Sequence, residues 1–182
     1  AALKAAAAEV MARHGRCDIL VNSAGTTRAV PHADLEALDD ALIDRVLQVN
    51  VRGPLATIRA FLPALKASGD AIIVNISSLA AISGTGSSII YGASKAAMDT
   101  AGLSLARVLG PAGIRVVSIS PAAVLTDFVP GRSRETVEKA AVTSPLRTLT
   151  EADDVALAVM ATITHLRLTT GVAILVDGGK HL

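Results

Sequence analysis

Three side chains that can hold or move a proton lie near the middle of the chain: Ser78, Tyr91 and Lys95. A phenol is a weak acid, with a reference pKa near ~10. A nearby ammonium favours the phenolate and therefore lowers that pKa. Because residues four apart share one face of a helix, a helix through this segment brings Tyr91 and Lys95 together. A tyrosine tuned in this way can serve as a general acid or base.

Each of these residues also has a simpler explanation when it is taken alone. Tyr91 and Lys95 are also compatible with a surface tyrosine beside a solvated lysine, and Ser78 with an ordinary turn after a strand. A serine hydrolase is disfavoured, because no His or Asp stands at a suggestive position and the Gly-x-Ser-x-Gly turn is absent. The histidines are far apart, so we expect no metal site. The single cysteine, Cys17, excludes an internal disulfide and favours a cytoplasmic location.

The elements that must position these residues alternate between strands and helices. Apolar runs predict strands over Asp18–Asn22, Ala71–Ile76, Ile114–Ile119 and Val172–Val176. Helical patterns cover Ala1–His14, Leu38–Lys66 with an interruption at Gly53-Pro54, Ile89–Leu109, a short stretch at Arg134–Ala141, and Thr150–Ile163 with Thr150 as its cap. This order indicates βαβ units, so we expect an α/β fold with a doubly wound parallel sheet in three α/β/α layers.

Composition limits the classes of function. The 182 residues are 51% hydrophobic but only 2% aromatic, and they carry a net charge of +1, so we expect a single domain over residues 1–182 with an aliphatic core. Lys and Arg do not cluster with stacking aromatics, which argues against nucleic-acid binding. Charges interrupt the apolar stretches well before the roughly 18 residues that a membrane span requires, so we expect no membrane span.

The loops that follow the predicted strands are the expected place for a ligand. Open parallel sheets bind ligands beyond the carboxyl ends of their strands. Here those loops are Asn22–Gly25, Ser77–Ser88 and Pro121–Ser144. Ser78 lies in one of them, and Tyr91 begins the next helix at the same edge. The sequence therefore predicts one crevice in which a hydroxyl, a phenol and an ammonium meet, suited to proton transfer beside a cofactor.

Six segments in a fixed order together resemble the short-chain dehydrogenase/reductase family, over essentially the whole chain. They are Asp18–Gly25, Val49–Val51, Ile73–Ser78 with Tyr91–Lys95, Ile114–Val116, Ser120–Thr126, and Thr170–Gly171 with Val176–Gly179. The overall pattern is closest to β-ketoacyl-carrier-protein-reductase-like members. The resemblance implies a Rossmann-like fold and an oxidoreductase that transfers hydride between NAD or NADP and a carbonyl or secondary alcohol. It also implies a homodimer or homotetramer.

The resemblance gives particular residues a role. Tyr91 is expected to be the general acid/base, Lys95 to lower its pKa and hold the nicotinamide ribose, and Ser78 to polarise the substrate oxygen. Asn50 is expected to fix a water in the proton relay, although capping or kinking a helix is an equal alternative. The residues expected to border the cofactor, besides Tyr91 and Lys95, are Asn22, Ala24, Gly25, Pro121, Val124 and Thr126.

The sequence also departs from the family pattern. The Gly-rich turn TGxxxGxG, on which the pyrophosphate rests, does not occur in it. We therefore expect an N-terminally incomplete chain, the C-terminal catalytic portion of a longer protein, that binds NADH and NADPH weakly or not at all. Ser23, Val117 and Ala122 stand where the family has Asn, Asn and Gly. The residues that choose between NAD and NADP are missing with the turn.

Two other functions stay open at this point. One is a non-catalytic remnant that serves as a partner-binding subunit, because the helices equivalent to Asn50–Lys66 and Ile89–Leu109 commonly pack between subunits in the family. The other is an epimerase or dehydratase of the extended family, which usually adds a sizeable C-terminal domain. The Asp127–Ser144 segment is expected to form a substrate lid, and its neighbourhood contains arginines that suit an anionic substrate: Arg132, Arg134 and Arg147.

Overall fold

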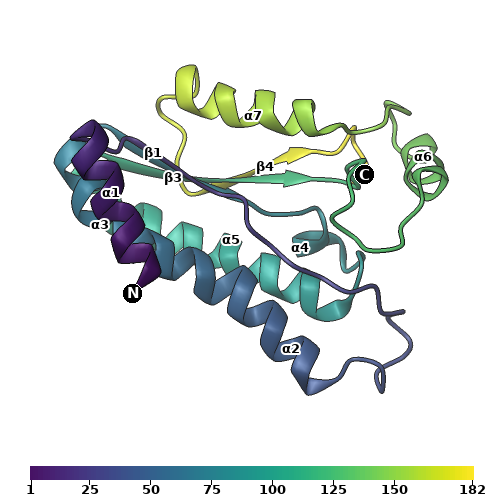
Figure 1. Ribbon diagram of the computed structural model, residues 1–182. Helices are drawn as coiled ribbons and strands as arrows, with labels where there is room; N and C mark the ends of the chain where they lie inside the picture. The colour runs from purple at the N-terminus through teal and green to yellow at the C-terminus, as the bar shows by residue number, and fades with distance from the viewer.

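The computed structural model describes all 182 residues, arranged around a four-stranded sheet with helices on both faces (Figure 1). All strands are parallel and lie in the order β1-β2-β3-β4. The strands are β1 (Ile19–Asn22), β2 (Ala71–Ile76), β3 (Ile114–Pro121) and β4 (Val172–Val176). The helices are α1 (Ala2–His14), α2 (Asp40–Leu47), α3 (Gly53–Ser68), α4 (Ala80–Ser83), α5 (Ile89–Leu109), α6 (Arg134–Val142) and α7 (Ala152–Thr164).

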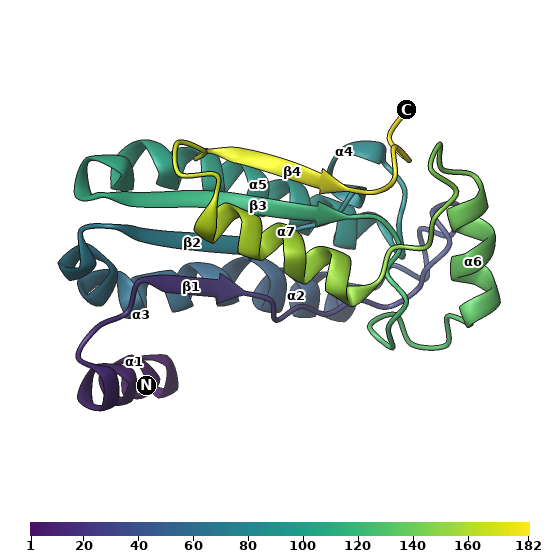
Figure 2. The same cartoon turned by 90° about the horizontal axis from the view of Figure 1, so that it is seen from above.

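The sheet is the middle layer of three. Helices α3 and α5 pack on one face, α7 packs on the other, and α1 lies against α3 rather than against the sheet (Figures 1 and 2). The larger core cluster fills the α3/α5 side and includes Leu65, Ile73 and Val116. A smaller cluster on the α7 side includes Val74 and Ile119. This arrangement confirms the doubly wound α/β/α fold.

The two central strands are mostly apolar and are buried along nearly their whole length, because both of their faces are covered. In β2, Ile73 and Val74 point to opposite faces and are both fully buried. The edge strand β1 differs: Leu20 is buried, whereas Ile19 and Val21 are 46% and 42% exposed. One face of β1 is therefore open on the side of the sheet that α7 covers elsewhere.

The boundaries of all four strands and of α5 agree with the sequence-based expectation to within two residues. The region Leu38–Lys66 differs in detail, because the interruption is a π-helical turn at Gln48–Arg52. The Gly53 N–H donates to the Gln48 carbonyl, five residues back. Pro54 has no N–H to offer the Asn50 carbonyl, so the wider turn forms just before the proline.

Two further expectations need correction. Thr150 does not cap the last helix; Glu151 does, because its side chain accepts from the Asp154 N–H while the Asp154 carboxylate accepts from the Glu151 N–H. Thr150 instead bridges to Val124. The segment Ser77–Ser88 is not entirely a loop, since it contains the one-turn helix α4.

The last crossover runs over the opposite face of the sheet from the first two. The connections β1-to-β2 and β2-to-β3 pass through α3 and α5, whereas β3-to-β4 passes through α7 (Figure 2). Each strand is added to the same edge of the sheet, so a crossover over the opposite face has the opposite hand. The last crossover is therefore left-handed if the first two are right-handed as usual, and left-handed crossovers are rare. Its long connection, residues 122–171, carries α6 beyond the carboxyl ends of the strands (Figure 2).

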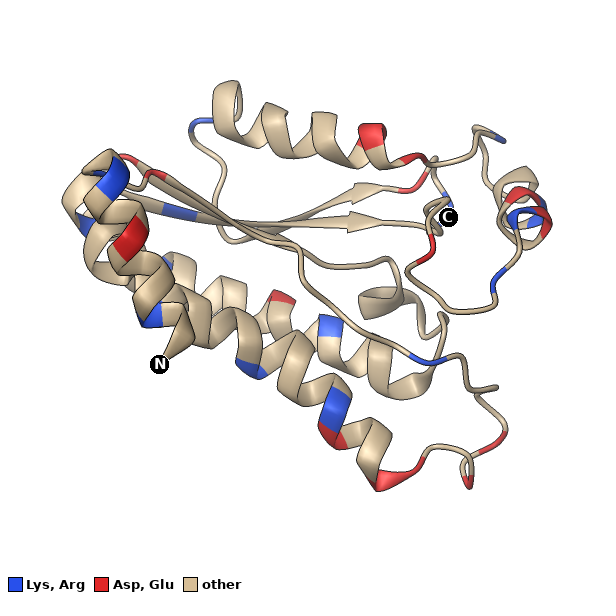
Figure 3. Cartoon of the chain, viewed as in Figure 1, with Lys and Arg blue, Asp and Glu red and all other residues tan.

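Charged residues of both signs lie mainly on helices and loops, and the strands carry almost none (Figure 3). The exception is Arg115 on β3, whose guanidinium donates to the carbonyls of Thr162 and Leu166 near the end of α7. Long apolar helices of the kind that cross a bilayer do not occur in the structure.

A tight contact between two turns at the amino ends of β2 and β3 gives a test of the fold. Gly113 has φ +71°, and a Cβ there would overlap the Gly69 carbonyl. We expect Gly113→Ala to destabilise the protein by about 3 kcal/mol, through strain and backbone overlap. Gly15 has φ +69° but nothing near its Cβ position, so Gly15→Ala should cost only about 1 kcal/mol. Urea unfolding of both variants measures the difference, and equal losses would contradict the contact.

Candidate active site

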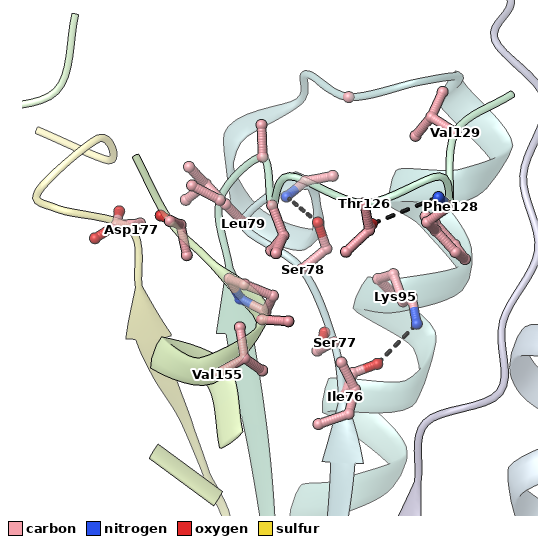
Figure 4. Close-up of a pocket in the computed structure, with 18 of the residues that line it drawn as sticks. Ile76, Ser77, Ser78, Leu79, Lys95, Thr126, Phe128, Val129, Val155 and Asp177 are labelled. Carbon is pink, nitrogen blue, oxygen red and sulfur yellow. Dashed lines mark hydrogen bonds between the residues drawn. The ribbon is translucent and has the colours of Figure 1, made fainter. Parts of the chain in front are cut away.

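A single large cavity of about 860 Å³ opens at the carboxyl ends of the strands. Its wall is formed by the loops after β1, β2 and β3, the first turns of α5 and the first half of α7. Ser78, Tyr91 and Lys95 all line it, as do four of the residues expected to border a cofactor: Gly25, Pro121, Val124 and Thr126. Figure 4 shows Ser78, Lys95 and Thr126 within this region.

The start of α5 places Tyr91 in the cavity wall. Ser88 is the N-cap of the helix, is fully buried, and its Oγ accepts a hydrogen bond from the Tyr91 N–H at 3.4 Å. This cap fixes the first turn of the helix and with it the direction of the phenol. The Tyr91 ring lies 5.8 Å from that of Phe128, centroid to centroid, at an angle of 53°.

Lys95 is a buried ammonium one turn further along α5. It is only 6% exposed, and its Nζ donates to the Ile76 carbonyl at the end of β2 at 2.7 Å (Figure 4). Burial lowers the pKa of Lys95 to about 8, and the charge of Asp99 opposes that shift. The Nζ atom also lies 5.7 Å from the centroid of the Tyr91 ring.

The pKa of Tyr91 is shifted in the opposite direction from the one expected from the sequence. The sequence predicts that Lys95 lowers the pKa of the phenol, whereas burial raises the pKa of Tyr91. The Ser78 hydroxyl and the positive charge of Arg132 act against that rise. Lys95 does not offset the effect of burial on the Tyr91 pKa, because its ammonium is directed toward the Ile76 carbonyl.

Ser78 forms the expected turn after β2 and also lines the cavity. Its Oγ accepts a hydrogen bond from the Ala80 N–H at 3.2 Å, which is the turn that begins α4 (Figure 4). Because that bond uses only the oxygen as an acceptor, the O–H remains able to donate. The hydroxyl lies on the cavity wall near the Tyr91 phenol.

Asn50 lies behind the cavity, in the π-helical turn, with 1% of its surface exposed. Its Oδ1 accepts from the Thr26 N–H at 2.8 Å. Its Nδ2 donates to the Thr26 carbonyl and to Ser94 Oγ, both at 3.0 Å. The side chain therefore ties the loop after β1 to α5 and has little capacity left for other contacts.

Two of the residues expected to border the cofactor do not line the cavity. Asn22 is buried, and its amide donates to Asn75 Oδ1 on β2 at 2.9 Å, so it supports the loop after β1 from behind. Ala24 lies in the same loop outside the cavity wall, between Ser23 and Gly25, which both line it.

The structure adds two charged residues to the surroundings of the site. Arg132 was expected only as a lid arginine for an anionic substrate, but its Nη2 donates to the Val124 carbonyl at 2.7 Å. Asp99 was not among the residues expected at the site; it follows Lys95 by four residues on α5. The spacing argument that connects Tyr91 to Lys95 also connects Lys95 to Asp99, so the sequence did contain that signal.

The cavity fits the nicotinamide end of a dinucleotide. A nicotinamide riboside presents ribose hydroxyls and a carboxamide, and both need hydrogen-bond donors and acceptors. The Lys95 ammonium keeps protons that Ile76 does not take, and Thr126 offers a hydroxyl on the opposite wall. The cavity volume lies within the range of natural cofactor and ligand sites.

Comparison with known proteins agrees with these observations. The family described as Enoyl-(Acyl carrier protein) reductase matches residues 1–181. A Streptomyces violaceoruber protein named as a ketoacyl reductase of the granaticin polyketide synthase is 39% identical over 171 residues, which is 93% of this chain and 68% of that relative. L-xylulose reductase from Caenorhabditis elegans is 38% identical over 172 residues, which is 88% of this chain and 64% of the enzyme.

A solved structure extends the agreement to the fold. The 3-ketoacyl-(acyl-carrier-protein) reductase from Brucella melitensis, complexed with NADH, superposes on this chain with a TM-score of 0.88 at 30% identity. The superposition covers 99% of this chain and 74% of the reductase. The chain thus spans roughly two thirds to three quarters of the length of these proteins. The resemblance inferred from the motifs is confirmed, and the chain belongs to the short-chain dehydrogenase/reductase family of NAD(P)-dependent oxidoreductases.

Proposed function

We propose that the protein reduces a carbonyl group to a secondary alcohol, with Tyr91 as the proton donor. The observation that carries this proposal is a half-buried phenol on the wall of a cavity that Ser78 and Lys95 also line. A phenol carries its proton at neutral pH, and Ser78 and the positive charge of Arg132 favour release of that proton, because both act to lower the pKa of Tyr91. The same groups serve the reverse oxidation once the phenol has lost its proton.

In this mechanism, Ser78 donates its hydroxyl to the substrate oxygen and so polarises the carbonyl. Reduced nicotinamide, when bound, supplies the hydride that reaches the carbonyl carbon. Tyr91 gives its proton to the oxygen, and the nearby positive charges of Lys95 and Arg132 stabilise the phenolate that remains. The free protons of the Lys95 ammonium hold the ribose hydroxyls.

In this mechanism Asn50 acts through its backbone carbonyl. Its side chain is hydrogen-bonded to Thr26 and Ser94. Its backbone carbonyl cannot accept the usual helical hydrogen bond from residue 54, because Pro54 has no N–H. We propose that this carbonyl binds the water of the proton relay that the family resemblance implies. The loop with Ala24 and Gly25 borders the adenosine side, with Asn22 as its support, and Pro121, Val124 and Thr126 border the carboxamide and phosphates.

The rest of the cavity favours a substrate with an apolar chain. Its lining beyond the polar groups is aliphatic and aromatic (Figure 4), formed by Leu79, Phe128, Val129, Val155, Val159 and Met160. A polyol would leave many hydroxyls unpaired against such a wall. We therefore favour an acyl-chain ketone, the class suggested by the names of the ketoacyl reductases to which the chain is similar.

We further propose that residues 1–182 form one domain of a cytoplasmic homodimer or homotetramer. Exposed apolar side chains support the assembly, because Leu103 and Val108 on α5 are 52% and 69% exposed. Leu157 on α7 is 68% exposed. No specific observation favours the alternative of a non-catalytic, partner-binding subunit.

The acid role of Tyr91 is tested by Tyr91→Phe in the complete protein. Phenylalanine keeps the ring and its contact with Phe128 but has no proton to give. We expect turnover to fall by about 1000-fold, the middle of the range for losing a general acid, with cofactor affinity nearly unchanged. Steady-state kinetics and calorimetric titration with NADH and NADPH give both values. Turnover within tenfold of the wild type would remove Tyr91 from the mechanism.

A buried charge retained for function should destabilise the fold. Lowering the pKa of Lys95 from 10.5 to about 8 corresponds to about 3 kcal/mol at neutral pH. The unfolded chain binds more protons than the folded one between pH 8 and 10.5, so the penalty is complete below this window and disappears above it. We therefore expect Lys95→Met to gain roughly 1–3 kcal/mol at pH 7 while losing activity.

Urea unfolding of the wild type and Lys95→Met across this pH range measures the effect. The stability difference should shrink steadily as the pH rises from 8 to 10.5. A variant that is less stable than the wild type at pH 7 would mean that Lys95 is a packing residue.

A further inference from the structure

A half-buried carboxylate, Asp99, lies one helical turn beyond Lys95, and the mechanism above does not use it. Asp99 follows Lys95 by four residues on α5, so the two side chains leave the same face of the helix. That helix packs against β3. Asp99 Oδ1 is shielded from solvent and has no hydrogen-bond partner. A buried carboxylate oxygen in this state requires an explanation, because such atoms are usually paired.

Two serine hydroxyls of the sheet lie near Asp99. Burial raises the pKa of Asp99, and Ser118 on β3, Ser77 after β2 and the Lys95 charge act against that rise. Ser77 Oγ is itself buried without a partner, so its O–H is free to turn toward the carboxylate. Ser118 and Asp99 also line a small cavity of about 140 Å³ between α5 and β4. The surroundings of Asp99 therefore offer donors that favour its charged form.

Lys95 has no counter-charge other than Asp99. Its ammonium donates to the uncharged Ile76 carbonyl and forms no salt bridge. Asp99 is the group that opposes the lowering of the Lys95 pKa by burial. Because Lys95 is buried and Asp99 Oδ1 is shielded from water, their attraction is weakly screened even without direct contact.

The other elements around α5 supply no competing charge. Helix α4 and strand β4 contain no titratable side chain. Arg115 of β3 is engaged with carbonyls near the end of α7. The charged residues of α2, the π-helical turn and α3 are all exposed: Asp40, Asp44, Arg45, Arg52, Arg59 and Lys66.

We propose that Asp99 is a positioning residue that keeps the Lys95 ammonium protonated from the buried side of α5, with Ser77 and Ser118 holding its carboxylate. Asp99 touches neither substrate nor cofactor and acts only through Lys95. Its effect on the Lys95 charge is independent of the function proposed above, whereas its effect on turnover rests on that function.

The direct experiment is an NMR titration of the lysine side-chain methylene carbons in the 182-residue chain, with the Lys95 signal assigned by its loss in Lys95→Met. We expect Asp99→Asn and Asp99→Ala each to lower the pKa of Lys95 by about one unit, because each removes the negative charge that favours the protonated amine. Asp44→Asn makes the same charge change at an exposed site on α2, and should leave the Lys95 pKa in place. An unchanged Lys95 pKa in a folded Asp99 variant overturns the proposal.

The pH dependence of kcat/KM in the complete protein separates this proposal from the proposed function. If Lys95 must be protonated for turnover, the alkaline limb of the profile should move down with the Lys95 pKa, giving about tenfold lower activity above the limb. A lowered Lys95 pKa with an unmoved limb would uphold the role of Asp99 and reject the role of Lys95 in turnover. Rescue of both values by Asp99→Glu would exclude a merely structural effect.

Discussion

The site depends on one buried hydrogen bond, between the Lys95 ammonium and the Ile76 carbonyl at the carboxyl end of β2. The bond fixes the position of a charge that the surrounding apolar groups disfavour. The covered sheet makes this burial possible, because α5 packs on the neighbouring strand β3 and the loop after β3 lines the cavity. The rare crossover from β3 to β4 contributes by sending α6 and α7 around this end of the sheet.

Burial has opposite consequences for the two ionisable groups that share the cavity wall. It favours the neutral amine of Lys95 and the neutral phenol of Tyr91. Burial therefore shifts both pKa values, that of Lys95 downward and that of Tyr91 upward. The groups that counter this effect come from elsewhere in the chain: Asp99 acts on Lys95, while Ser78 and Arg132 act on Tyr91. The balance of charge in the site is thus spread over α5, the loop after β2 and the loop before α6.

Much of this structure could be predicted from local pattern. The apolar runs of β2 and β3 and the helical pattern over Ile89–Leu109 are strong signals, and the structure has α5 at the expected residues. The π-helical turn around Asn50 could not be predicted, because its cause combines Pro54 with tertiary bonds to Thr26 and Ser94. The direction of the Tyr91 pKa was also wrong, since sequence spacing gives proximity but not the degree of burial. Arg132 reaches the site through loop geometry, which the sequence pattern does not specify.

Tyr91 is the only tyrosine of the chain and there is no tryptophan, so ionisation of the phenol can be followed by its near-ultraviolet absorbance without interference. We expect a midpoint above the reference value of ~10 in the folded protein. Arg132→Gln should shift it higher, whereas Lys95→Met should leave it nearly in place, because Lys95 is already neutral at such pH. A midpoint at or below the reference value, or one that moves with Lys95 rather than with Arg132, would contradict it.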